Sequence, residues 1–134
     1  MKLDHPICAW VIDLNGDAIV FQDFFRECLD EGGLSTGDIF VADNCTIHCY
    51  GDNEYLQEVL WEQYHILMIT LPPYHPEFNP TELVFRATLT KLRSMRSNDE
   101  DFELNDVISE ITIFLYTEIT LYSVQYFYRQ CGYF

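Results

Sequence analysis

The stretch "LPPYHPEFNPTELVF", residues 71–85, places three prolines ahead of a helix and a fourth just inside it. Proline fixes its own φ and biases the preceding residue towards extended backbone, so an ordered, extended approach to the helix is expected. Asn79 is a favourable N-cap, Pro80 suits the first helical position, and Glu82 is then the third helical residue. The pattern therefore predicts a glutamate held at a helix entrance by stiff backbone.

Three interpretations of Glu82 are open. Its carboxylate can accept a hydrogen bond from the Asn79 backbone N–H, as in a capping box. It can instead pair with Arg86 one turn later, which is worth a few tenths of a kcal/mol. In the third interpretation Glu82, Arg86 and Arg93 share a narrow strip of the helix, where the acid holds a cation and the arginines contact phosphates.

Hydrophobic patterning on both sides of this stretch predicts strands alternating with helices, and hence a sheet with parallel pairs. Asn15-Gly16 is a strong hairpin signal between two apolar runs. The expected strands are residues 7–13, 18–22, 38–44 and 65–71. The expected helices are residues 23–33, residues 54–64, one from Pro80 with Phe85, Leu89 and Leu92 as its core stripe, and a last one from about Asn105 towards the C-terminus.

The composition fits one domain of 134 residues, 49% of them hydrophobic. No apolar run is long and charge-free enough to span a bilayer, so no membrane partner is expected. Five cysteines without framework spacing favour a reducing compartment inside the cell, the nucleus or the cytoplasm. The net charge of −15 repels nucleic acid, but four of the seven bases lie between Arg86 and Arg96, where a polyanion would have to bind.

Asp43 ends the apolar run "IFVAD", at the carboxyl end of a predicted strand. Ligands bind at such strand ends in open α/β sheets, although Asp43 and Asn44 suit a turn equally well. Cys45, His48 and Cys49 raise the alternative of a zinc site. Because no second ligand pair follows at usable spacing, a histidine that packs near the strand end is the favoured interpretation of His48.

Together, "VADNCTIH" (residues 41–48) and "LPPYHPEFNPTELVFRATLTKLR" (residues 71–93) closely resemble the catalytic domain of DDE-type transposases. These are the mariner-like elements and related bacterial insertion-sequence enzymes. Their pattern is an apolar strand ending in Asp-Asn, a histidine four residues later, and then Leu-Pro-Pro-Tyr-x-Pro, Asn-Pro and an acid. The matching positions are Asp43, Asn44, His48, Leu71, Pro72, Pro73, Tyr74, Pro76, Asn79, Pro80 and Glu82.

The resemblance implies an α/β, RNase H-like fold with a mixed sheet flanked by helices. It also implies cleavage and strand transfer on DNA, with transposon ends as the partner and Mg²⁺ (or Mn²⁺) as the cofactor. Asp43 and Glu82 would be the second and third carboxylates of the metal site. The expected supporting residues are Asn44, His48, Asn79 and Pro80. The expected DNA-binding residues are Arg86, Lys91, Arg93 and Arg96.

The chain departs from the family pattern at the first catalytic aspartate, which lies on a strand ahead of the hairpin. Asp4 has no strand before it and Asp13 suits a solvated turn, so the domain is expected to lack its first strand. Two carboxylates leave a two-metal site under-charged, so we expect this chain alone to be inactive. It would then be an incomplete transposase, or an RNase H-like remnant used for protein contacts.

The expected organisation is a partial DDE endonuclease domain at residues 1–97. An acidic linker and a C-terminal helix packed on the same domain follow at residues 98–134. The sheet edge left by the missing strand invites pairing with a second copy, so a homodimer is expected. An α/β module unrelated to transposition would require the proline motif to be a coincidence.

Overall fold

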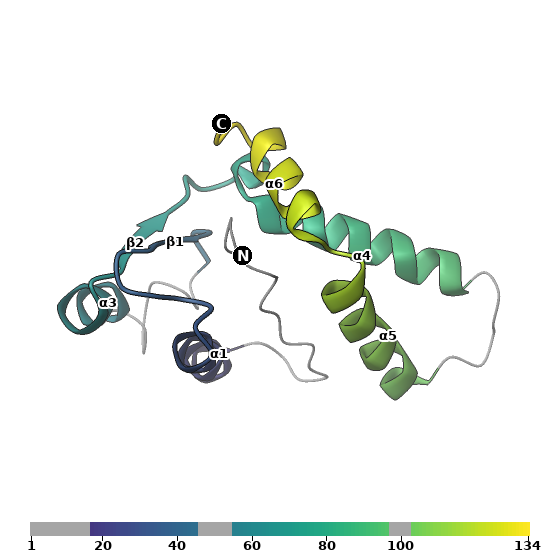
Figure 1. Ribbon diagram of the computed structural model, residues 1–134, viewed down its shortest axis with the longest axis horizontal. Helices are drawn as coiled ribbons and strands as arrows, with labels where there is room; N and C mark the ends of the chain where they lie inside the picture. The colour runs from purple at the N-terminus through teal and green to yellow at the C-terminus, as the bar shows by residue number, and fades with distance from the viewer. Residues whose placement is uncertain (1–16, 46–54, 97–102) are drawn as a thin grey trace. The chain divides into compact units, whose positions relative to one another are not determined.

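The computed structural model describes residues 17–45, 55–96 and 103–134 (Figure 1). These residues form two compact units that divide between Asn79 and Pro80. Each unit has its own buried core. The strand predicted at residues 7–13 and the turn predicted at Asn15-Gly16 lie outside the described residues.

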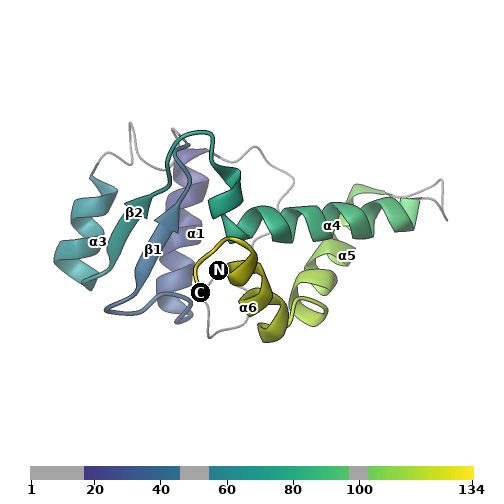
Figure 2. The same ribbon diagram turned by 90° about the horizontal axis from the view of Figure 1, so that it is seen from above.

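The first unit is an α/β arrangement in which two parallel strands are joined through a helix. Its elements are α1 (Ala18–Asp30), β1 (Ile39–Ala42), α3 (Leu56–Tyr64), β2 (Leu67–Thr70) and the 3₁₀ helix η2 (Pro76–Phe78). The strands run in the same direction (Figure 2), with Ile39 opposite Leu67 and Ala42 opposite Thr70. A parallel pair needs a crossover connection, and α3 lies within it. The predicted parallel pairing is therefore confirmed, although the described part of the chain holds one pair and no wider mixed sheet.

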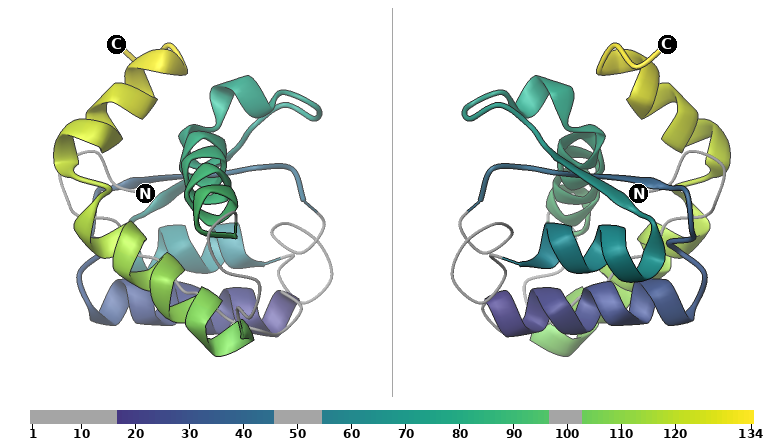
Figure 3. Two further views of the ribbon diagram at one scale, coloured as in Figure 1. Left: turned by 90° about the vertical axis from the view of Figure 1, so that its right-hand side faces the viewer. Right: turned by 90° about the vertical axis from the view of Figure 1, so that its left-hand side faces the viewer.

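The core of the first unit lies on one face of this strand pair, because α1 and α3 both cover that face (Figures 1 and 3). Its buried residues are Phe25, Ala42, Leu60, Ile66 and Met68. On the opposite face of β2, Leu67 and Ile69 are exposed. From Ile66 to Ile69 buried and exposed side chains thus alternate, as the two-residue period of a strand requires.

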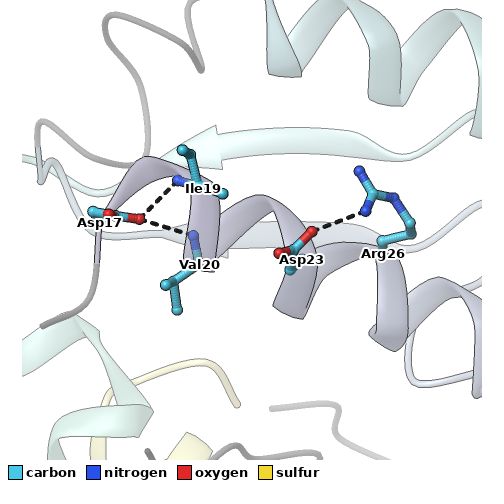
Figure 4. A network of polar contacts seen from close by, with 5 residues as sticks. All are labelled: Asp17, Ile19, Val20, Asp23 and Arg26. Atoms are coloured by element: carbon cyan, nitrogen blue, oxygen red, sulfur yellow. Dashed lines mark hydrogen bonds and ion pairs between the residues drawn. The ribbon is translucent and has the colours of Figure 1, made fainter. Parts of the chain in front are cut away.

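The strand predicted at residues 18–22 is wrong, because these residues open helix α1. The Asp17 carboxylate accepts hydrogen bonds from the backbone N–H groups of Ile19 and Val20, at 3.0 and 2.9 Å (Figure 4). This is an N-cap, which satisfies main-chain donors that a helix start leaves unpaired. The other helix end agrees with the prediction, because Gly32 follows it with a positive φ of 75°.

The second unit consists of three helices: α4 (Pro80–Arg96), α5 (Leu104–Thr117) and α6 (Leu121–Gln130). Its core residues are Val84, Phe114, Leu115, Ile119 and Val124. The single C-terminal helix that we predicted is wrong, because the chain bends by 87° between α5 and α6. Thr120 causes a new helix start there, since its side chain caps α6 by accepting from the Ser123 N–H at 3.3 Å.

The predicted core stripe of α4 is wrong at two of its three positions, and the third, Leu92, is half-buried. Phe85 and Leu89 are 56% and 51% exposed, whereas Val84 is 4% exposed and Ala87 packs against the same core. Apolar residues lie on more than one face of α4, so periodicity alone does not say which face α5 and α6 will cover. Within the described residues no single helix has both the length and the apolar character needed to cross a membrane. Taken together, α5 and α6 would have the necessary length and composition, but they are bent by 87° relative to each other.

Candidate active site

Asp43 follows directly after β1, at the carboxyl end of the parallel pair. Its side chain accepts a hydrogen bond from the Cys45 backbone N–H at 3.2 Å, so the predicted turn is present. Asp43 is partly buried and Asn44 is exposed. The hydrogen bond holds the carboxylate at the strand end, where the resemblance expects a metal ligand. His48 and Cys49 lie outside the described residues, so neither their supporting role nor the zinc alternative is tested.

The proline run begins beside Asp43. The Leu71 N–H donates to the Ala42 carbonyl at 2.8 Å, which extends the pairing of the two strands to the first residue of the run. The expected extended approach holds only in part, because Tyr74 turns the chain with a φ of 62°. A left-handed backbone costs a residue with a side chain on the order of 1 kcal/mol. The run is therefore a tight, ordered turn and not a straight lead into the helix.

A local polar contact stabilises the next part of the run. The His75 Nδ1 atom lies 2.7 Å from the Glu77 carboxylate, and the His75 ring packs on Phe78 with 5.5 Å between ring centres. This hydrogen bond from His75 holds the pKa of the Glu77 carboxyl below its usual value. The Asn79 N–H then donates to the Pro76 carbonyl at 2.9 Å and closes η2.

Glu82 lies in the first turn of α4, as predicted. Asn79 has extended backbone, and Pro80 is the first helical residue and is buried. The capping-box interpretation of Glu82 is not supported, because the N–H of Asn79 is bonded to Pro76. Nor does Glu82 pair with Arg86, and no residue in the described ranges bonds to the Glu82 carboxylate. Neither of the two structural interpretations therefore accounts for this acid.

Asp43 and Glu82 belong to different units, so their sharing of a cation stays a prediction. Residues 17–45, 55–96 and 103–134 contain no group of three or more acidic, histidine or cysteine side chains placed as in a metal site. The donor chemistry nevertheless fits the predicted cofactor. Carboxylate oxygens are the ligands that Mg²⁺ prefers, and Mg²⁺ commonly uses only one or two of them, with water completing its shell.

The predicted DNA-binding residues all lie on α4 but differ in their surroundings. Arg86 and Arg93 are exposed, and neither forms an ion pair with any residue that the structure describes. Lys91 is engaged: its Nζ atom lies 2.7 Å from the Glu118 carboxylate and 5.9 Å from the centre of the Phe114 ring. Arg96 is the last residue of the helix. Their role in binding DNA stays a prediction.

The sequence model of one protein family, described as DDE superfamily endonuclease, matches residues 2–105 of the chain. The protein is a member of this DDE family. No curated protein and no solved structure matches the chain. The match takes in β1, the proline run and α4, so both Asp43 and Glu82 lie inside the DDE domain. The resemblance seen in the sequence motifs is thereby confirmed.

The C-terminal part of the chain extends beyond the DDE match. Almost all of α5 and the whole of α6 follow residue 105. Sequence reasoning missed that Glu118, the residue directly after α5, is a partner for Lys91, because Glu118 is 27 residues away along the chain. It also missed a groove between α4 and α6. The available signal was the spacing of three and four residues between Leu83, Ala87, Thr90 and Ser94.

Proposed function

We propose that this DDE domain belongs to an enzyme that cleaves DNA phosphodiester bonds and joins strands at transposon ends, using Mg²⁺ or Mn²⁺. Asp43 and Glu82 would hold the cation. The observation that carries the proposal is the family match across the segment that contains both acids. The Glu82 carboxylate adds support, because no described residue bonds to it.

When bound, such metal ions activate the attacking water or 3′-hydroxyl and stabilise the leaving oxygen. The task of the chain is to hold oxygen ligands in place. Asp43 is held by its hydrogen bond to the Cys45 N–H, and Glu82 by the helix entrance at Pro80. Two carboxylates leave a two-metal site short of negative charge, so we propose that cleavage requires a further acidic ligand in addition to these two.

Arg86, Arg93 and Arg96 would bind the DNA phosphates. Lys91 would also bind them when its ion pair with Glu118 breaks. These bases follow Glu82 along the same helix, so phosphates near the reacting bond and the metal ligand would be held by one rigid element. We also propose a fuller RNase H-like mixed sheet, a homodimer, and a location in the nucleus or the cytoplasm. The free cysteines Cys45 and Cys131 support a reducing compartment.

Metal titration tests the site without requiring catalysis. Mn²⁺ broadens NMR signals near its binding site, so the amide signals of residues 43–45 and 81–83 are expected to weaken first. Glu82→Gln and Asp43→Asn should each weaken Mn²⁺ binding about tenfold. The matched controls are Glu77→Gln, in the same proline run, and Asp30→Asn, at the exposed end of α1. Equal losses in a variant and its control would refute the assignment of that acid.

A second candidate function is a remnant of the DDE domain that acts through protein contacts. The observation that favours it is the net charge of −15, which opposes DNA binding over most of the chain. The two candidates differ in the response of DNA affinity to Arg93→Glu. An enzyme domain should lose affinity for duplex DNA in this variant, whereas a protein-binding remnant should show no measurable affinity before or after the change.

A further inference from the structure

The second unit contains an open groove of about 660 Å³ between α4 and α6. One wall is the face of α4 from Leu83 to Ser94, which spans about 16 Å at 1.5 Å per residue. The other wall is α6, where Tyr126 and Phe127 line the groove. Phe114 of α5 is also a lining residue. The groove is thus as long as three helical turns and is largely aromatic and aliphatic inside.

Most polar side chains in the groove already have partners within the protein. The Thr90 hydroxyl donates to the Arg86 carbonyl at 2.9 Å, and the Ser94 hydroxyl donates to the Lys91 carbonyl at 2.6 Å. Lys91 itself is paired with Glu118. Arg86 is the one cation of the groove that has no ion-pair partner in the described part of the chain. The groove therefore offers apolar surface and a single unpaired positive charge.

The charge of the two walls is opposite to the charge of the rest of the protein. The helices α4 and α6 carry five of the seven basic residues and one of the 22 acids, a net charge of +4. The remaining residues carry −19. Two of the five bases, Arg86 and Lys91, line the groove. An acidic ligand is consequently attracted to these two helices and repelled elsewhere.

We propose that the groove binds an acidic amphipathic helix of a partner protein. The apolar side chains of that helix, recurring at intervals of three and four residues, would lie over Tyr126 and Phe127, and one of its carboxylates would pair with Arg86. This is the helix-in-groove mode of peptide recognition, and the length of the groove matches about three turns of a bound helix. The inference does not rest on the proposed metal chemistry. Its aromatic residues all lie outside the segment matched by the DDE family.

The same observations disfavour a nucleic acid strand in this groove. A phosphate backbone carries a charge at every nucleotide and is bound by several cations, whereas the groove offers one that is unpaired. The exposed arginine that follows along the helix, Arg93, does not line the groove. An acidic peptide needs only one cation to orient it, because apolar burial supplies most of its binding free energy.

The test uses the full 134-residue chain and labelled peptides of about 15 residues, followed by fluorescence anisotropy. One probe has leucines at helical spacing and glutamates elsewhere, a second replaces the glutamates with lysines, and a third replaces the leucines with serines. We expect the acidic leucine peptide to bind at least about tenfold more tightly than either of the others. Equal binding of the acidic and basic peptides would overturn the proposal.

Matched variants locate the site. Arg86→Glu should weaken binding of the acidic peptide about tenfold, whereas Arg93→Glu makes the same change of charge outside the groove and should weaken it less than about threefold. Thr90→Trp fills the groove and should block the peptide without changing any charge. Circular dichroism checks that each variant is folded. Equal losses in the two arginine variants, full binding by Thr90→Trp, or tighter binding of a DNA oligonucleotide at the groove residues would each contradict the proposal.

Discussion

At the scale of single residues, short polar side chains determine where the backbone changes direction. Asp17 caps α1, Asp43 closes the turn after β1, and Thr120 caps α6. In each case a side-chain oxygen accepts from a main-chain N–H two or three residues later, and so satisfies a donor that the regular element leaves unpaired. These contacts involve few atoms, yet they mark where α1 and α6 begin and where the chain turns after β1.

Removing the cap of α1 should destabilise the protein measurably. Asp17 accepts two main-chain hydrogen bonds, so Asp17→Ala is expected to lower the free energy of unfolding by about 1 kcal/mol. Asp17→Ser retains an accepting oxygen and should restore most of the loss. Urea denaturation followed by circular dichroism measures both. If Asp17→Ala and Asp17→Ser are equally stable, the cap is not what holds this helix end.

The pairing of His75 with Glu77 predicts a dependence on pH. The hydrogen bond from His75 lowers the pKa of Glu77 below its ordinary value of 4.5, so the folded state favours the ionised carboxylate. The pair therefore stabilises the fold fully above that ordinary value, and its contribution is lost as the pH falls through the lowered pKa. NMR titration of the Glu77 carboxyl signal should give a pKa that rises in His75→Gln. An unchanged Glu77 pKa in this variant would show that another group causes the shift.

At the scale of elements, the sequence could predict those parts in which pattern and packing agree. The two parallel strands, α3 and the entrance of α4 were predicted because apolar runs, helical spacing and Pro80 each point to a single outcome. The start of α1 was missed because residues 18–22 are a short apolar run, and such a run fits a strand or a helix equally well. The break at Thr120 was missed because the apolar periodicity continues through this position. A single capping residue was the signal that a new helix starts there.

The candidate site was predictable only to the level of its separate parts. Proline chemistry placed Glu82 in the first turn of a helix, and the end of an apolar run placed Asp43 after a strand. Contacts between distant residues have no local signal, as the pairing of Lys91 with Glu118 illustrates. The same limit explains the wrong core stripe on α4, since α5 and α6 decided that Val84 would be buried and Phe85 exposed.

The core of the first unit predicts a sharp contrast between two neighbouring positions on α3. Leu60 is 1% exposed and Val59 is 38% exposed. Leu60→Ala should therefore cost about 2–5 kcal/mol of unfolding free energy, because it removes buried methyl groups and leaves a cavity. Val59→Ala should cost less than about 0.5 kcal/mol, as is usual for surface changes. Chemical denaturation compares the two, and similar losses would mean that α3 presents a different face to the strands.

At the scale of the whole molecule, charge is distributed very unevenly. The bases are concentrated on α4 and α6, while most of the chain is acidic. Any anionic partner is therefore bound by a small number of cations against general repulsion. The number of cations that are available then sets how strongly salt weakens binding, because each phosphate that is neutralised releases condensed counterions from DNA.

This count gives a prediction for the proposed binding of DNA. If Lys91 stays paired with Glu118, three bases of α4 remain, and the logarithm of affinity should fall against the logarithm of salt concentration with a slope of about −2.7. Glu118→Gln frees Lys91 and should steepen the slope to about −3.6. Asp106→Asn removes a charge from the exposed start of α5 without freeing a base, so it should change the affinity but not the slope. Titrations of duplex DNA at several salt concentrations measure all three proteins. Identical slopes for the original chain and Glu118→Gln would contradict this prediction. A common slope of about −3.6 would mean that Lys91 already contacts phosphate, and a common slope of about −2.7 would mean that it never does.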